Sequence, residues 1–365
     1  MSLDNPRTNK EEISFSLNGK SVKANENDTI WQVAKREGLE IPHLCWKDSP
    51  GYRADGNCRA CMVEIEGERV LAASCVRKPT EGMSVRSDGE RVESNRKIVF
   101  DLLASDMPSK DTSPDPEAHF WVQARNANFS TTSFPSGRPG ANKEIPVDSI
   151  FHDASHPSIA VNLDACISCG LCERACKEVQ VNDVIGMGKR GMDAMPVFDV
   201  FDPMGTSSCV ACGECVQACP TGALMEKTLL DKSSKIRAVY PDKKVESVCP
   251  FCGVGCRTEV SVKDNKIISV DGLQGPANRG KLCVKGRFGM DYVMNPERLT
   301  KPLIRKSGVK KDPNGAYKFS DISMLFREAS WEEAMDVAAS KFLKILNAKG
   351  GQALSGFGSA KGTNE

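Results

Sequence analysis

Two cysteine runs decide how this chain folds: DACISCGLCERAC at residues 164–176 and SCVACGECVQACP at residues 208–220. Both have the spacing C-x2-C-x2-C-x3-C, and Pro220 follows the last cysteine of the second run. This spacing is typical of a pair of [4Fe–4S] clusters, in which the fourth cysteine of each run binds the cluster of the other run. A zinc site more often uses two CxxC pairs separated by a longer loop. The pattern predicts two ligand sets: Cys166, Cys169, Cys172 and Cys219, and Cys176, Cys209, Cys212 and Cys215.

The composition narrows the class of protein. At 365 residues the chain is long enough for about two or three domains. Its 49 basic and 48 acidic residues nearly balance, so nothing indicates a nucleic-acid partner or an anionic membrane surface. The 16 cysteines divide into four groups of four, which ligand sets explain and disulfides do not. MSLDNPRTNKEE lacks the apolar core of a signal peptide, and no segment approaches the roughly 20 apolar residues of a membrane span. We therefore expect a cytoplasmic protein in a reducing compartment.

The N-terminal residues 12–90 contain the signals of a β-grasp ferredoxin domain. A hairpin is predicted around Asn18-Gly19, a short helix after Asp28 or Thr29, and a second hairpin over residues 62–75. Four cysteines in this region have the spacing C-x12-C-x2-C-x13-C, which departs from the plant-type C-x4-C-x2-C run of [2Fe–2S] proteins. A zinc site or simply buried thiols are the alternatives. We expect one [2Fe–2S] cluster on Cys45, Cys58, Cys61 and Cys75.

Residues 91–155 are predicted to connect two cluster domains. Apolar residues at helical spacing predict a helix over 91–105, with Ile98, Leu102 and Leu103 facing a core. The following stretch, 106–148, is rich in Pro, Ser, Asp and Asn, and its aromatic residues are expected to pack. The chain has no cysteine between Cys75 and Cys166, so the flanking domains must approach each other directly for electrons to cross.

A fourth cysteine set follows in residues 242–300, with the spacing C-x2-C-x3-C-x26-C. Residues 258–272 alternate as a hairpin with its turn at 263–265. A zinc ribbon and a [4Fe–4S] site both fit this spacing. Further on, residues 331–346 predict an amphipathic helix, followed by a strand that leads into a Gly-rich turn. The fourth set is Cys249, Cys252, Cys256 and Cys283, and the expected buried face of the helix is Ala334, Val337, Ala338, Phe342 and Ile345.

Several strings resemble one enzyme family. VCPFCGVGC, CVKGRF and EVQVNDVIGMGKRG are similar to segments of the large subunit of cytoplasmic, NAD-linked formate dehydrogenases that use molybdenum or tungsten held by two pterin guanine dinucleotides. IPHLCW and GNCRACMVEI look like the [2Fe–2S] domain shared with the large iron–sulfur subunit of respiratory NADH dehydrogenase. In these families a site of one histidine and three cysteines often lies between the first two cluster domains. This chain lacks those cysteines, which leaves His119 without cluster partners.

The resemblance implies a specific chemistry. The family oxidises formate to carbon dioxide, and electrons pass through [4Fe–4S] and [2Fe–2S] clusters to a flavin-bearing partner that reduces NAD. It implies that the fourth cysteine set binds a [4Fe–4S] cluster and that Lys285 lies between this cluster and the pterin as an electron relay. The family's catalytic residues, a metal-ligating Cys or selenocysteine with His and Arg beside it, would lie beyond Glu365. We therefore expect the N-terminal part of a longer polypeptide that has no catalytic residue within the present sequence.

The expected fold class is α+β multidomain. Its parts are a β-grasp [2Fe–2S] domain (12–90), a helix and connecting segment (91–155), a bacterial-type double [4Fe–4S] ferredoxin domain (156–235), a small mostly-β [4Fe–4S] domain (242–300) and the incomplete start of an α/β molybdopterin-binding domain (301–365). The alternatives are an NADH-dehydrogenase-like large iron–sulfur subunit, an iron-only hydrogenase, a stand-alone electron-transfer module and a zinc-binding scaffold.

Overall fold

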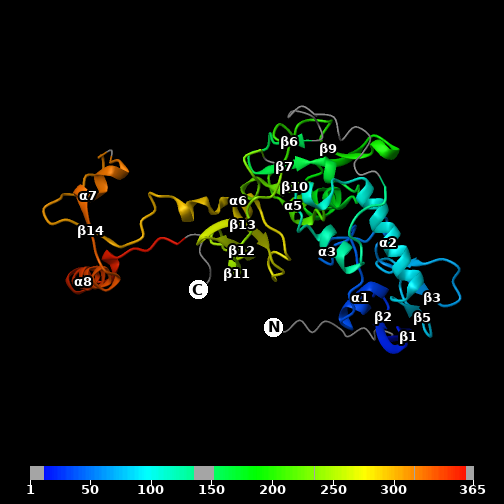
Figure 1. Ribbon diagram of the computed structural model, residues 1–365. Coiled ribbons are helices and arrows are strands. Elements are labelled where there is room, and N and C mark those ends of the chain that lie inside the picture. Colours follow the sequence, from blue (N-terminus) through cyan, green and yellow to red (C-terminus); the bar gives the residue numbers. More distant parts are fainter. Residues whose placement is uncertain (1–11, 135–151, 234, 316, 359–365) are drawn as a thin grey trace. The chain divides into compact units, whose positions relative to one another are not determined.

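A computed structural model of the chain describes residues 12–134, 152–233, 235–315 and 317–358 (Figure 1). The chain divides into two compact units. Unit 1 comprises residues 1–248 and 256–288, and unit 2 comprises residues 249–255 and 289–365. Among the described helices, none combines the length and the apolar character that a bilayer-spanning segment requires.

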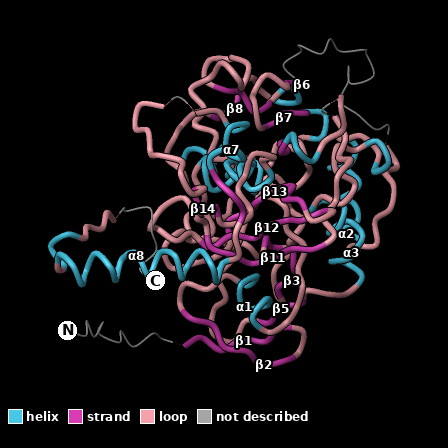
Figure 2. Tube along the Cα trace, turned by 90° about the vertical axis from the view of Figure 1, so that its left-hand side faces the viewer, coloured by secondary structure: helices cyan, strands magenta, loops and turns pink. Residues whose placement is uncertain are grey.

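Unit 1 begins with a five-stranded sheet in the order β2-β1-β5-β3-β4. Figure 2 shows β1, β2, β3 and β5 side by side, with α1 next to them. β1 pairs antiparallel with β2 and parallel with β5, and Asn18 and Gly19 form the predicted turn with positive φ angles. The strands are β1 (Glu12–Leu17), β2 (Lys20–Asn25), β3 (Met62–Ile65), β4 (Ala72–Ala73) and β5 (Ser84–Arg86).

Helix α1 (Ile30–Arg36) closes one face of this sheet. Its N-cap is Thr29, one of the two expected residues, and Thr29 and Gln32 form a capping box that satisfies free backbone donors of the first turn. Ile30 and Val33 are fully buried on the helix face toward the sheet. The two predicted hairpins and the helix between them are thus confirmed.

Helix α2 (Glu90–Ser105) forms where it was expected, but the predicted buried face is wrong. Ile98 and Leu102 are each about half exposed, at 54% and 51%, and only Leu103 packs partly against the core. The buried residues instead follow a four-residue step, which places them on one helix face. That face consists of Val92, Arg96, Phe100 and Ala104.

The connecting segment contains a short helix that the sequence did not predict, α3 (His119–Asn126). It lies beside α2 in both ribbon views (Figures 1 and 2). Phe120, Trp121 and Phe129 are buried here, and Phe100 of α2 contacts Phe120 edge to face. The expectation of packed aromatic residues in this segment is confirmed, while 135–151 lie outside the described residues.

The double cysteine run folds around two short helices, α4 (Leu171–Arg174) and α5 (Glu214–Ala218). Each helix begins after a glycine with a left-handed backbone, Gly170 and Gly213, which lets the cysteine loop turn sharply into the helix. A Cβ atom on Gly213 would lie 2.0 Å from Cδ of Arg287, so this position also requires the absence of a side chain. The surrounding strands are β6 (His152–Asp153), β7 (Ile159–Asn162) and β10 (Leu224–Glu226) in one sheet, and β8 (Ile185–Gly188) and β9 (Met195–Phe198) in another.

The last part of unit 1 is a three-stranded antiparallel sheet in the order β11-β12-β13, followed by helix α6 (Val284–Phe288). β12 (Arg257–Lys263) and β13 (Lys266–Gly272) form the predicted hairpin, and its turn residues Asp264 and Asn265 have positive φ angles. β11 (Lys243–Val248) was not predicted as a strand.

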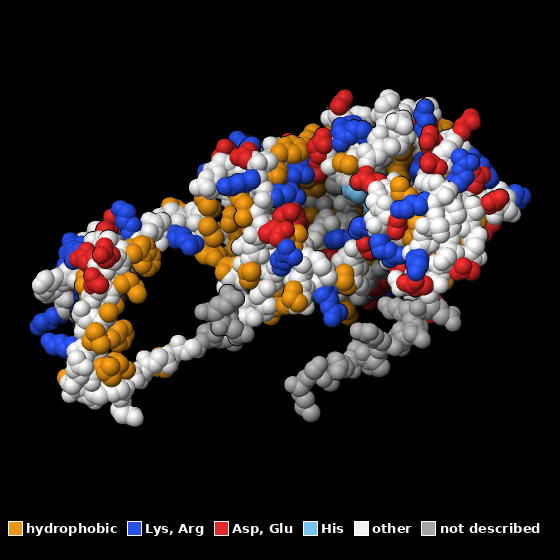
Figure 3. Space-filling model, turned by 90° about the horizontal axis from the view of Figure 1, so that it is seen from below, with side chains coloured by type: hydrophobic (Ala, Val, Ile, Leu, Met, Phe, Trp, Pro, Cys, Tyr) orange, Lys and Arg blue, Asp and Glu red, His pale blue; other side chains and the backbone are white. Residues whose placement is uncertain are grey.

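Unit 2 contains a strand pair, β14 (Leu303–Arg305) and β15 (Phe326–Glu328), together with helices α7 (Ile322–Leu325) and α8 (Trp331–Lys349). The predicted helix over 331–346 is present as α8, but no residue of its expected face is buried, and only Ala334 and Val337 of that face are partly buried. Phe342 is 59% exposed, and hydrophobic side chains are visible on the surface of unit 2 in Figure 3. The expected strand after the helix is absent from residues 350–358, which contain a 3-10 turn.

Candidate iron–sulfur sites

The four cysteines of the N-terminal domain lie together in its buried core. Hydrogen bonds from Cys58 and Cys75 lower the pKa of Cys45 to about 2. A hydrogen bond from Cys75 lowers the pKa of Cys61 to about 7, and the pKa of Cys75 itself is raised by its bonds to Cys45 and Cys61. The backbone N–H of Cys58 also points at Cys45 Sγ, 3.5 Å away. The four thiols therefore face one another, as the ligands of a single iron–sulfur core must.

The double run brings its cysteines together in two mixed groups. Burial raises the pKa of Cys172, and the next causes, in order, are the charges of Cys166, Cys169 and Cys219, with Cys215 of the other group last. Burial also raises the pKa of Cys215, followed by the charges of Cys212, Cys209 and Cys176. Each group of neighbours thus takes three cysteines from one run and the fourth from the other, which is the exchange that the spacing predicts.

The surroundings of the second group suit a cluster. One cavity is lined by all four of its cysteines and by apolar side chains that include Val184, Phe198 and Met204. The backbone N–H of Val184 points at Cys176 Sγ and that of Ala211 at Cys209 Sγ, each at 3.4 Å. Backbone donors aimed at sulfur and an apolar wall are the features that tune the potential of an iron–sulfur cluster. Within the described ranges, no group of three or more His, Cys, Asp or Glu is arranged to hold a single metal ion.

The [2Fe–2S]-type loop and the first cysteine run contact each other directly. Arg174, on α4, pairs with Asp55 and donates from one nitrogen, Nη2, to the carbonyl oxygens of Cys45 and Cys169 at 2.5 and 3.2 Å. The side-chain amide of Asn57 also donates to the Cys169 carbonyl, at 3.4 Å. The domains on either side of the connecting segment therefore meet without an intervening cysteine site, as the sequence required.

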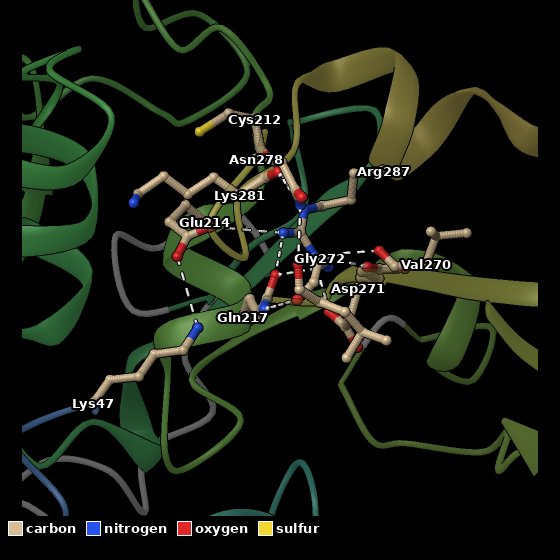
Figure 4. Close-up of polar contacts among 12 residues, drawn as sticks. Lys47, Cys212, Glu214, Gln217, Val270, Asp271, Gly272, Asn278, Lys281 and Arg287 are labelled. Carbon is tan, nitrogen blue, oxygen red and sulfur yellow. Dashed lines mark hydrogen bonds and ion pairs between the residues drawn. The ribbon is translucent and has the colours of Figure 1, made fainter. Parts of the chain in front are cut away.

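A second buried arginine links the other cysteine run to the β12–β13 sheet (Figure 4). Arg287, on α6, is 2% exposed and donates to the Cys212 carbonyl at 2.9 Å and to Gln217 Oε1 at 2.5 Å. It also donates to Asp271 Oδ1 at 2.9 Å and lies 3.8 Å from the carboxylate of Glu214. The same guanidinium thus holds together a cysteine loop, helix α5 and strand β13.

Two buried carboxylates, Glu214 and Glu226, lie near Arg287. Glu214 accepts a hydrogen bond from the hydroxyl of Tyr52 at 2.8 Å and lies 3.7 Å from Lys47 Nζ. Burial raises the pKa of Glu226 to about 8, and the charge of Asp271 adds to this effect. At neutral pH, Glu226 is therefore largely protonated, 4.0 Å from Arg287.

The fourth cysteine set is divided between the two units: Cys249 and Cys252 lie in unit 2, and Cys256 and Cys283 lie in unit 1. Cys249 is buried, while Cys252 and Cys283 are exposed. Lys285 is exposed on α6, two residues before the buried Arg287. The ligand set and the relay role of Lys285 stay predictions.

The histidines have structural partners. His119 Nε2 lies 2.9 Å from the carbonyl oxygen of His43, and the two rings meet edge to face. His43 also packs against Trp31, and burial, followed by the charge of His119, lowers the pKa of His43 to about 4. His43 is therefore part of an aromatic contact between the N-terminal domain and helix α3 of the connecting segment.

Comparison with known proteins identifies three domains in series. Residues 10–90 match the family described as a 2Fe-2S iron-sulfur cluster binding domain, and residues 165–223 match the 4Fe-4S dicluster domain. Residues 242–295 match the molybdopterin oxidoreductase Fe4S4 domain. The chain contains three iron–sulfur domains.

Longer curated relatives are similar to this chain over most of its length. "Putative formate dehydrogenase YrhE" of Bacillus subtilis is 30% identical over 388 residues, which cover 97% of this chain and 37% of the relative. An NADH-quinone oxidoreductase subunit of Rhizobium meliloti is 30% identical over 363 residues, covering 97% of this chain and 38% of the relative. The chain therefore spans just over a third of the length of these curated relatives.

The solved structures that are similar in fold include the NAD+-reducing [NiFe]-hydrogenase in the H2-reduced state. The matched chain is 25% identical, with a TM-score of 0.51, and the match covers 60% of this chain and 89% of that one. This chain is therefore similar in fold, over part of its length, to a protein with a different printed activity.

Sequence reasoning missed the residues that join these domains. Arg174 and Glu214 lie inside the cysteine runs, where the spacing draws attention only to sulfur. Arg287 lies inside CVKGRF, the string in which Lys285 was chosen. The sequence shows only that Arg174 lies within a cysteine run and that Arg287 lies two residues after Lys285. Neither position indicates that the side chain is buried.

Proposed function

We propose that this chain is the iron–sulfur electron-transfer part of a formate dehydrogenase catalytic subunit. One [2Fe–2S] and three [4Fe–4S] clusters would be held by the four cysteine sets, and when bound they accept and release one electron at a time. The remaining chemistry, oxidation of formate to carbon dioxide at a molybdenum or tungsten bis-pterin centre, would belong to the full-length protein. A flavin-bearing partner subunit would pass the electrons to NAD in the cytoplasm.

The observation that carries this proposal is the exchange of the fourth cysteine between the two runs. Cys219 neighbours the first loop and Cys176 neighbours the second, within a buried and largely apolar setting. A zinc site more often uses two CxxC pairs separated by a longer loop, so two interleaved groups of four cysteines favour iron–sulfur clusters. The role of this chain's own residues is to hold the sites close together, exclude water and aim backbone donors at sulfur.

Formate as the substrate rests on relatives such as YrhE and on the match of residues 242–295. The test is to prepare the full-length protein anaerobically and to follow its visible absorbance and low-temperature paramagnetic signals after addition of formate. Reduction by formate supports the proposal. Clusters that dithionite reduces and formate does not would contradict formate as the substrate.

The second candidate is an electron-transfer subunit similar to that of NADH-quinone oxidoreductase. It is favoured by the match to the Rhizobium meliloti protein, which covers as much of this chain as the formate dehydrogenase-like relative does. In that case, NADH and the flavin partner would reduce the clusters of the complex, while formate would have no effect. Adding formate to one sample and NADH to another therefore distinguishes the two candidate functions.

A further inference from the structure

Among the contacts between the first two cluster domains, which include Asn57 with Cys169 and Arg53 with Glu178, one buried guanidinium reaches both cysteine loops. The side chain of Arg174 is 4% exposed, and its nitrogen Nη2 donates to the backbone carbonyls of both Cys45 and Cys169. These two cysteines belong to different predicted ligand sets, one on each side of the domain boundary. The second nitrogen, Nη1, pairs with Asp55, in the loop that carries the [2Fe–2S]-type cysteines.

We propose that Arg174 is the positioning residue for electron transfer between these two sites, and this proposal rests on the proposed function above. Its guanidinium fixes the two cysteine loops at one separation and connects their backbones through a single donor group. One electron would leave the reduced centre at Cys166, Cys169, Cys172 and Cys219 and reduce the oxidised centre at Cys45, Cys58, Cys61 and Cys75. Arg174 keeps its proton throughout, and no covalent bond forms or breaks.

Stability alone does not explain a charge at this position. A buried ion pair is often no more stabilising than an apolar contact of similar volume, because both charges lose their hydration. Arginine has a rigid fork of donors that can serve a carboxylate and two carbonyls at once, whereas the single ammonium of lysine offers no such planar arrangement. Its positive charge beside both loops also favours the arrival of an electron at either site.

The same boundary contains a matched control. Arg53 pairs with Glu178 at 2.9 Å and also with Asp55, so it crosses between the same two segments. Its side chain is 64% exposed, and its recorded partners are carboxylates only. Replacing Arg53 therefore removes an ion pair across the boundary without touching either cysteine carbonyl.

The experiment compares Arg174→Lys, Arg174→Met and Arg53→Met in the full-length protein with its clusters assembled. Iron content and the low-temperature paramagnetic spectrum of each centre are measured first. The rate of electron transfer between the two centres is then followed after flash reduction, together with their magnetic interaction by pulsed paramagnetic resonance. We expect both Arg174 variants to transfer electrons about 10-fold or more slowly, as is usual when an outer partner of a metal ligand is removed, and Arg53→Met to match the unmodified protein.

The possible results distinguish a failure of the proposed role of Arg174 from a failure of the proposed iron–sulfur function. If the unmodified protein shows no cluster signals, the proposed function fails. If both centres assemble in an Arg174 variant and transfer electrons at the unmodified rate, only the role of Arg174 is overturned. If neither Arg174 variant assembles its centres while Arg53→Met does, Arg174 serves assembly alone, and the proposal is likewise overturned.

Discussion

Replacing Arg287 with methionine tests whether the buried arginine holds the second cysteine loop against the β12–β13 sheet. The side chain makes four hydrogen bonds, to Cys212, Gln217, Val270 and Asp271. At about 1 kcal/mol net for each bond, their loss reduces the free energy of unfolding by about 4 kcal/mol. Breaking a buried pair by removing one partner costs about 3–5 kcal/mol, which agrees with this figure.

The assay is a urea titration of the anaerobic protein with its clusters, followed by tryptophan fluorescence and visible absorbance. Midpoints of the variants are compared under one protocol, because a protein that loses its clusters does not unfold in a single reversible step. With an m value of about 3 kcal/mol/M, a loss of about 4 kcal/mol lowers the midpoint by about 1.3 M.

The matched control is Lys244→Met, which removes an exposed ion pair with Glu259 in the same sheet. Exposed pairs contribute about 0–1 kcal/mol, so its midpoint should fall by about 0.3 M at most. If Arg287→Met lowers the midpoint no more than Lys244→Met does, the reasoning about the buried guanidinium is wrong.

Three further predictions concern other parts of the chain. Thr29→Ala removes the capping box of α1 and should lower the free energy of unfolding by about 1 kcal/mol, measured as above; an unchanged midpoint would contradict the role of the cap. Glu226 has its pKa raised by burial to about 8 from its usual 4.5, so the folded state holds a proton that the unfolded state releases. Stability should therefore fall as pH rises between about 4.5 and 8, and Glu226→Gln should reduce that fall; an identical pH dependence of the two midpoints would refute it. Cys219→Ser combined with Cys166→Ala should remove about four irons, because both side chains are expected to bind one cluster. Cys219→Ser combined with Cys209→Ala should remove about eight irons, because these side chains are expected to bind different clusters. Equal losses of iron in the two double variants would exclude the exchange of ligands between the runs.

The cluster domains were predictable because the spacing of the cysteines along the sequence indicates which of them can bind one cluster. Four thiolates must converge on one core, so the runs that end at Cys176 and Cys219 restrict the fold of their own neighbourhood. Turn and cap signals near Gly19 and Thr29 are equally local. These features depend on a few neighbouring residues, and the structure confirms the local elements.

Long-range packing was not predictable in the same way. In α2, several apolar positions compete for the core, and the face centred on Phe100 is buried while Ile98 points outward. Nothing in the spacing shows that Arg174 and Arg287 are buried between domains, because a cation is usually solvated.

The central claim is that four quartets of thiolates each hold an iron–sulfur cluster. The most direct test is the iron and acid-labile sulfide content of anaerobically prepared protein, measured together with its low-temperature paramagnetic spectrum after reduction. One [2Fe–2S] and three [4Fe–4S] clusters predict about 14 irons per chain and signals from both cluster types. A fully reconstituted sample that holds about eight irons or fewer, or a colourless protein without such signals, would contradict it.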